Sequence, residues 1–141
     1  MLDIKGLTKI FSPGTINEKT ALDHVDLSLA SGDFVTIIGS NGAGKSTLMN
    51  CIAGVHSVDE GTIILDGQDI TRLPEHKRAK QIGRVFQDPL KGTAFDMTIE
   101  ENLSIAYNKN RSRGLQWGIS RKDRELFREK LRLLDMGLED R

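Results

Sequence analysis

Apolar and polar residues alternate along the first part of the chain, which is the pattern of half-buried strands. The alternation covers residues 2–11 and 21–33 and predicts a strand in each. Residues 34–39, "FVTIIG", carry apolar and β-branched side chains with little alternation, which is typical of a strand buried on both faces. Shorter apolar runs predict two further strands, over residues 61–67 and 82–87.

Four segments predict helices, and they span residues 45–54, 73–81, 97–107 and 120–137. The first is apolar on most sides and stops at Gly54, as a buried helix does. Thr98 and Glu101 have the spacing of a capping box at the start of the third. Strands therefore give way to helices near Asp88, where we expect a boundary between two parts of the chain.

Composition narrows the function classes. The chain has 141 residues, enough for one domain or part of a larger one, and its 20 basic and 20 acidic residues cancel. Overall charge therefore predicts neither nucleic-acid binding nor a membrane-surface role. Residues 109–132 are locally basic; this stretch fits contact with lipid headgroups or RNA, or the solvated face of the last helix, which we favour. The single cysteine, Cys51, excludes an intrachain disulfide and is interpreted as a small buried hydrophobic residue.

Residues 39–47, "GSNGAGKST", carry the strongest chemical signal in the chain. Gly39, Gly44, Lys45 and Ser46 match the pattern G-x-x-x-x-G-K-[ST], and the segment lies between a predicted strand and a predicted helix. Glycines let successive backbone N–H groups point into one concavity that binds anions. The N-terminus of the following helix adds unpaired donors and partial positive charge. The alternative, a glycine-rich turn with a surface lysine, is disfavoured because the full pattern and both flanking elements agree.

Each polar residue of this loop has a predicted role in binding a nucleoside triphosphate with Mg²⁺. The Lys45 ammonium can reach the terminal phosphates, and the Ser46 hydroxyl is a hard oxygen ligand for Mg²⁺. Thr47 can donate to a neighbouring phosphate. The predicted nucleotide-binding residues of the loop are Gly39, Ser40, Asn41, Gly42, Ala43, Gly44, Lys45, Ser46 and Thr47.

Five stretches together resemble the ATP-binding subunits of ABC transporters. The glycine loop has that family's Asn-Gly-Ala-Gly core, and "RVFQDP" at 84–89 resembles the strand that carries the family's Q-loop glutamine. The segment "MTIEENL" at 97–103 resembles the one that usually follows. Residues 22–39 resemble the strands that lead into the loop, and "LTKIF" at 7–11 places a phenylalanine where an adenine-stacking tyrosine is usual. The resemblance covers essentially residues 1–138.

This resemblance implies an α/β fold, a P-loop NTPase (RecA-like) core with an N-terminal antiparallel β-subdomain and the start of a helical subdomain. Residues 1–87 would form the β-subdomain and an incomplete core, and residues 88–141 part of the helical subdomain. Phe11 would stack on adenine; the alternative interpretation, that Phe11 is an ordinary core residue, is equally compatible with the sequence. Gln87 would contact Mg²⁺ and the attacking water and act in catalysis with Lys45; a polar residue that ends a strand is the alternative.

The implied function is the ATP-binding and ATP-hydrolysing motor subunit of a transporter, with an importer favoured. Membrane-spanning subunits, a second copy of the chain and a solute-binding protein are the implied partners, at the inner, cytoplasmic face of the cell membrane, and no nucleic acid is expected. Two alternatives stay open, a nucleotide-binding fragment that does not hydrolyse ATP and a soluble ABC ATPase that acts on ribosomes or DNA.

Two parts of the family pattern have no match in these residues, the Leu-Ser-Gly-Gly-Gln loop and the acidic strand that holds Mg²⁺ and polarises water. The run "IILD" at 63–66 resembles that strand superficially, but Gly67 follows it and we interpret Asp66 as part of a turn. We therefore expect the chain to be a fragment of a longer ATPase. On its own it should hydrolyse ATP very slowly or not at all, because phosphoryl transfer depends on positioning and charge neutralisation.

Overall fold

The computed structural model describes residues 1–109 and 118–138, apart from the side chain of Pro89. Residues 110–117 of the basic stretch lie outside the described part. The chain forms two compact units, Met1–Ile82 and Gly83–Arg141. The sequence placed a boundary between residues 87 and 88, and the assignment of the two parts as subdomains stays a prediction.

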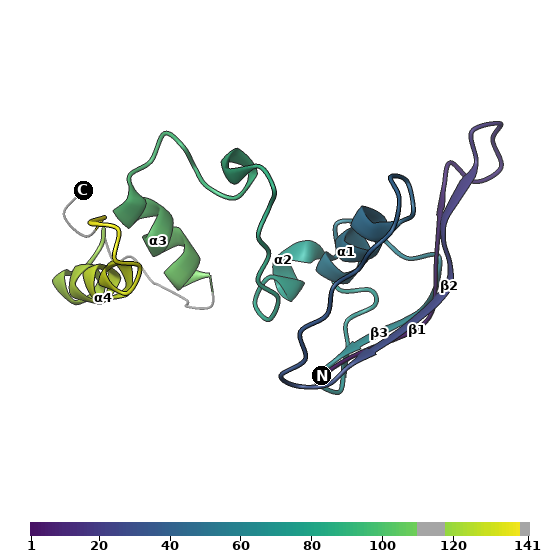
Figure 1. Cartoon of the computed structure of the whole chain (residues 1–141), viewed down its shortest axis with the longest axis horizontal. Coiled ribbons are helices and arrows are strands. Elements are labelled where there is room, and N and C mark those ends of the chain that lie inside the picture. Colours follow the sequence, from purple (N-terminus) through teal and green to yellow (C-terminus); the bar gives the residue numbers. More distant parts are fainter. Residues whose placement is uncertain (110–117, 139–141) are drawn as a thin grey trace. The chain divides into compact units, whose positions relative to one another are not determined.

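The first unit contains a four-stranded antiparallel sheet in the order β2-β1-β3-β4 (Figure 1). The strands are β1 (Leu2–Phe11), β2 (Lys19–Leu29), β3 (Glu60–Leu65) and β4 (Gln68–Asp69). Leu2 of β1 lies opposite Leu29 on one side and Leu65 on the other, so β1 is a central strand. This arrangement confirms the strands predicted for the N-terminal alternating segments and for residues 61–67.

The connection between β3 and β4 is a tight two-residue turn. Asp66 and Gly67 both have positive φ, 49° and 79°, and they follow Leu65, which pairs with Gln68. Two left-handed central residues are the geometry of a type I′ hairpin turn, for which Asp-Gly is a preferred sequence. The Asp66 carboxylate binds the amino group of Met1. The interpretation of Asp66 as a turn residue is therefore confirmed.

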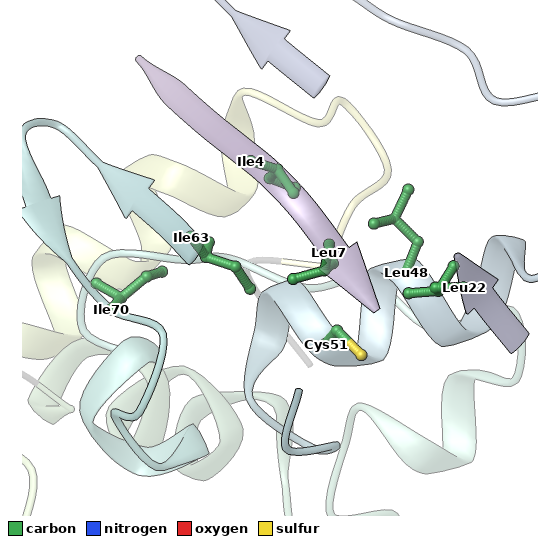
Figure 2. Packing of buried hydrophobic residues seen from close by; sticks show 7 residues of the cluster. All are labelled: Ile4, Leu7, Leu22, Leu48, Cys51, Ile63 and Ile70. Atoms are coloured by element: carbon green, nitrogen blue, oxygen red, sulfur yellow. The ribbon is translucent and has the colours of Figure 1, made fainter. Parts of the chain in front are cut away.

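A small hydrophobic core joins the sheet to helix α1 (Lys45–Ala53). Figure 2 shows Leu48 and Cys51 of α1 in one cluster with the apolar side chains of the sheet. Burial raises the pKa of the Cys51 thiol, so the neutral form is favoured and the side chain packs as an apolar group. The buried hydrophobic residues of this cluster are Ile4, Leu7, Leu22, Leu48, Cys51, Ile63 and Ile70.

Two predicted strands are wrong. Residues 34–39 and 82–87 have no regular secondary structure, and no described segment pairs with either of them. Phe34 is 95% exposed and Ile38 90% exposed, whereas the sequence predicted burial on both faces. A strand is stabilised by hydrogen bonds and side-chain packing from its neighbours. Apolar character alone does not create such neighbours, so the segment next to the glycine loop has no strand partner among the described residues.

The second unit contains a 3₁₀ turn (η1, Pro89–Lys91) and helices α3 (Ile99–Asn108) and α4 (Arg121–Arg132). Both helices begin at a complete capping box, with Thr98 and Glu101 at α3 and Ser120 and Asp123 at α4. The predicted starts of both helices are thus confirmed. The rings of Tyr107 and Phe127 meet edge to face with centroids 5.6 Å apart, which joins the two helices.

Two predicted helices are shorter than their sequence patterns. Helix α4 ends at Arg132 although the prediction extended to residue 137, and Asp135 has a left-handed φ of 50°. Leu133 and Leu134 are exposed, so no burial compensates for another turn of helix. Helix α2 comprises only Glu75–Arg78, with Pro74 as its N-cap.

Candidate nucleotide-binding site

The glycine loop between residues 39 and 44 bends at two glycines. Gly42 and Gly44 have φ of 83° and 84°, a left-handed conformation that is costly for residues with a Cβ atom. The Ala43 N–H donates to the Ser40 carbonyl oxygen at 3.2 Å and closes a turn inside the loop. The loop therefore curls back on itself before the chain enters α1.

Gly44 is also required for space. A Cβ atom at this position would lie 2.5 Å from the carbonyl oxygen of Ala21 and 3.1 Å from Cδ2 of Leu22. Both residues belong to β2, so the loop touches the sheet at the residue that precedes α1. The close contact holds the amino end of α1 against β2.

The amino end of α1 is open toward an anion. Its N-cap, Gly44, offers no side-chain hydrogen bond, and no acidic residue stands in the first turn. A helix in this state presents unpaired N–H groups and the positive end of its dipole. These features and the curled loop suit the binding of a phosphate chain.

The Lys45 side chain is folded over the loop. Its ammonium group donates to the carbonyl oxygens of Gly39 at 2.6 Å and Ser40 at 2.7 Å. The side chain of Lys45, which follows the loop, is thus bound to the two residues at the start of the loop. A phosphate oxygen of a bound nucleotide would compete with these two carbonyl groups for the same donors.

The other polar loop residues are accessible. Ser40, Asn41 and Ser46 are exposed, and Thr47 is half-buried in the first turn of α1. An accessible hydroxyl group at the start of the helix is a suitable hard ligand for Mg²⁺, so Ser46 fits the predicted metal role. The roles of these residues stay predictions.

Phe11, the predicted adenine contact, is half-buried at the end of β1. Its ring meets that of His56 edge to face, with centroids 5.3 Å apart, and the Lys9 ammonium lies 5.6 Å from its centroid. The Lys9 ammonium also pairs with Asp59 at 3.1 Å. The backbone hydrogen bond from Ile10, and secondarily Lys9, lowers the pKa of the Asp59 carboxyl group. Neighbouring contacts thus hold the Phe11 ring in one orientation.

Gln87, the predicted Q-loop residue, belongs to the second unit. It is exposed and lies in a segment without regular secondary structure. The alternative interpretation, a polar residue that ends a strand, required a strand over 82–87, and that strand is not formed. A role of Gln87 in binding Mg²⁺ or water stays a prediction.

Sequence reasoning missed Arg78, which is 2% exposed and contacts the far end of α1. Nothing in "PEHKRAK" separates this arginine from its charged neighbours. Only its position in the folded unit distinguishes it. Its four hydrogen bonds within the described residues go to backbone carbonyl oxygens, and no local sequence pattern predicts such partners.

Comparison with known proteins identifies the family of this loop. The family model described as ABC transporter matches residues 22–140. The chain belongs to the ABC transporter family. The glycine loop and α1 therefore form part of an ATP-binding cassette, and the predicted P-loop fold class is confirmed by similar solved structures.

Two curated relatives are named for transport systems. A tyrosine transport ATP-binding protein of Clostridioides difficile is 47% identical over 111 residues, which is 79% of this chain and 44% of the relative. A methionine import ATP-binding protein, MetN, of Corynebacterium glutamicum is 43% identical over 89 residues, which is 61% of this chain and 25% of the relative.

Two solved cassettes share the fold. The dimeric cassette MJ0796 in a post-hydrolysis state with ADP and Pi has a TM-score of 0.72 and 31% identity, over 93% of this chain and 56% of the cassette. The cassette MJ1267 has a TM-score of 0.77 and 32% identity, over 100% of this chain and 56% of the cassette. The chain thus spans about half the length of the first of these relatives and of both cassettes.

Proposed function

We propose that residues 39–47 bind the phosphates of ATP together with Mg²⁺, and that the chain is part of the motor subunit of an importing ABC transporter. The observation that carries the proposal is the curled glycine loop that leads into the uncapped amino end of α1. Two of the curated relatives are named for import or transport of amino acids, which supports the import role.

In this proposal Lys45 changes partners when the nucleotide binds. Its ammonium group gives up the carbonyl oxygens of Gly39 and Ser40 and donates to the terminal phosphates instead. The backbone N–H groups of residues 41–46 hold the rest of the phosphate chain, and Phe11 stacks on adenine. The backbone N–H groups of the loop and the Lys45 ammonium group together replace the water molecules that hydrate the phosphates in solution.

Ser46 and Gln87 are the residues that would hold Mg²⁺. The ion neutralises phosphate charge when it is bound. Ser46 contributes its exposed hydroxyl group from the first turn of α1. Gln87 orients water near the terminal phosphate.

We further propose that ATP hydrolysis belongs to the natural-length protein. The matched residues include no Leu-Ser-Gly-Gly-Gln loop and no strand that ends in Asp-Glu. The family contributes the first of these from a second cassette, so the proposed working state contains two copies, bound to membrane-spanning subunits at the cytoplasmic face and served by a solute-binding protein. None of the described helices is both long and apolar enough to cross a bilayer. A chain of these 141 residues alone should bind nucleotide with little or no turnover.

Nucleotide binding is tested with a fluorescent ATP analogue and the Lys45→Ala variant. We expect the variant to bind the analogue at least about tenfold more weakly, because it loses a charge-assisted contact to phosphate. Lys5→Ala, which removes an exposed lysine of β1, is the matched control and should bind normally. Equal affinities of the two variants would contradict the proposed site.

The transport role is tested by purification of the tagged natural-length protein from solubilised membranes and from the soluble fraction. Recovery together with a membrane-spanning protein in stoichiometric amount is the expected result. Recovery with ribosomes or DNA instead would replace the transporter by a soluble ABC ATPase. ATP turnover by the 141-residue chain at the rate of the natural-length protein would contradict the proposal that hydrolysis requires residues beyond these 141.

A further inference from the structure

The carboxyl end of α1 is held by a buried arginine from another element. Arg78 of α2 donates through Nη1 to the carbonyl oxygens of Cys51 at 2.7 Å and Ile52 at 2.9 Å. Both belong to the last turn of α1. In Figure 1, α2 is drawn next to α1 within the first unit.

The same guanidinium group also binds the segment that connects the sheet to α2. Its Nε donates to the Leu73 carbonyl oxygen at 2.7 Å, and Nη2 donates to that of Thr71 at 2.8 Å. One planar side chain therefore joins α1 to residues 71–73 through four hydrogen bonds. A lysine cannot replace this fork, because an ammonium group has three donors on a single atom.

Gly54 leaves the space that this arginine needs. A Cβ atom at Gly54 would lie 2.9 Å from Nε and 3.1 Å from Cδ of Arg78. The backbone N–H of Gly54 closes the helix end by donating to carbonyl oxygens of α1, with a left-handed φ of 83°. A residue with a side chain at position 54 would therefore collide with the Arg78 side chain.

The charge of Arg78 complements the dipole of α1. Helix carboxyl ends carry partial negative charge and are stabilised by cations, but α1 has no basic residue in its own last turn. Burial lowers the pKa of Arg78 from its ordinary value, and the carbonyl oxygens of the helix end offset that cost. Helix α1 therefore has the glycine loop at its amino end and, at its carboxyl end, a cationic side chain that belongs to another helix.

We propose that Arg78 is a positioning residue for nucleotide binding, which fixes the carboxyl end of α1 so that its amino end presents N–H groups to the phosphates. The inference rests on the proposed function of residues 39–47. Nine residues of helix separate the two ends by about 13 Å, so Arg78 does not touch the nucleotide. It acts through the rigid helix, whose other end is pressed against β2 at Gly44.

The test measures the Kd of a fluorescent ATP analogue for Arg78→Lys and for the control Arg72→Lys in the natural-length protein. Arg72 is an exposed arginine six residues earlier, so Arg72→Lys makes the same substitution at a position where the guanidinium group is not buried. Arg78→Lys keeps the charge, and we expect its Kd to rise about tenfold while that of Arg72→Lys stays the same. Melting curves define a temperature at which both variants are folded. A purely structural role of Arg78 would lower the melting temperature and leave the Kd of the folded protein unchanged, which would overturn the inference.

If the Arg78→Lys variant does not fold, a second measurement on the unaltered protein tests the same inference. The Nε–H resonance of Arg78 is followed by NMR, and we expect its exchange with water to slow when ATP is added. An unchanged exchange rate at saturating ATP would overturn the inference. Failure of the unaltered protein itself to bind the analogue would instead refute the proposed function, so the two failures are distinguishable.

Discussion

Replacing Gly44 by alanine tests whether close packing of the loop against β2 sets the stability of the first unit. The new Cβ would lie 2.5 Å from the Ala21 carbonyl oxygen, closer than such atoms approach in folded proteins, and the residue would keep a φ of 84°. The positive φ costs about 1–2 kcal/mol for a residue with a side chain. The forced separation from β2 adds about 1–3 kcal/mol, the usual cost of overpacking.

Gly42→Ala is the matched control, because Gly42 has the same conformation, with φ of 83°, and no atom within 4 Å of the added Cβ. The two variants should share the cost of the positive φ. The difference in their free energies of unfolding therefore isolates the clash at Gly44, which we expect to be about 1–3 kcal/mol.

The comparison is made by denaturant unfolding without nucleotide, so that ligand binding does not contribute. The single tryptophan and the single tyrosine, Trp117 and Tyr107, lie outside residues 1–82, so the signal is taken from the first unit itself. Hydrogen exchange of the amides of residues 48–53 follows α1 instead. Equal stability of Gly44→Ala and Gly42→Ala would refute the reasoning, because it would show that β2 yields to the added atom without cost.

Two further predictions concern a carboxylate and a helix cap. Asp59 has a lowered pKa in the folded state, so its stabilising effect is present above the pKa of a free aspartate, about 3.9, and is lost as the pH falls through the folded value. Asp59→Asn should thus lower the melting temperature at pH 7 and lower it progressively less as the pH falls below about 3.9; an equal effect at every pH would contradict the ionic role. Thr98→Ala should destabilise α3 by about 1 kcal/mol, because the capping box is lost. Thr98→Ser keeps the hydroxyl group and should retain most of the stability in the same denaturant titration, and equal losses would argue against the cap.

Local patterns predicted those elements whose stabilising contacts lie close in sequence. The capping box at Thr98 and the left-handed stop at Gly54 involve residues within one turn, so the sequence was sufficient to place these helix ends. The same holds for the turn at Asp66, where two adjacent residues select the conformation. Residues 34–39 were misassigned because apolar character alone does not show whether another segment pairs with them, and no described segment does.

The sequence by itself determined the chemistry of the loop, since glycines, a lysine and hydroxyl groups at fixed spacing suit a phosphate chain whatever surrounds them. Tertiary structure decided how that loop is held. Gly44 rests on β2, 22 residues or more before it in the chain, and Arg78 reaches the end of α1 from 26 residues away. Such contacts depend on how the chain folds back on itself, because no local pattern specifies which buried carbonyl groups a distant arginine will meet.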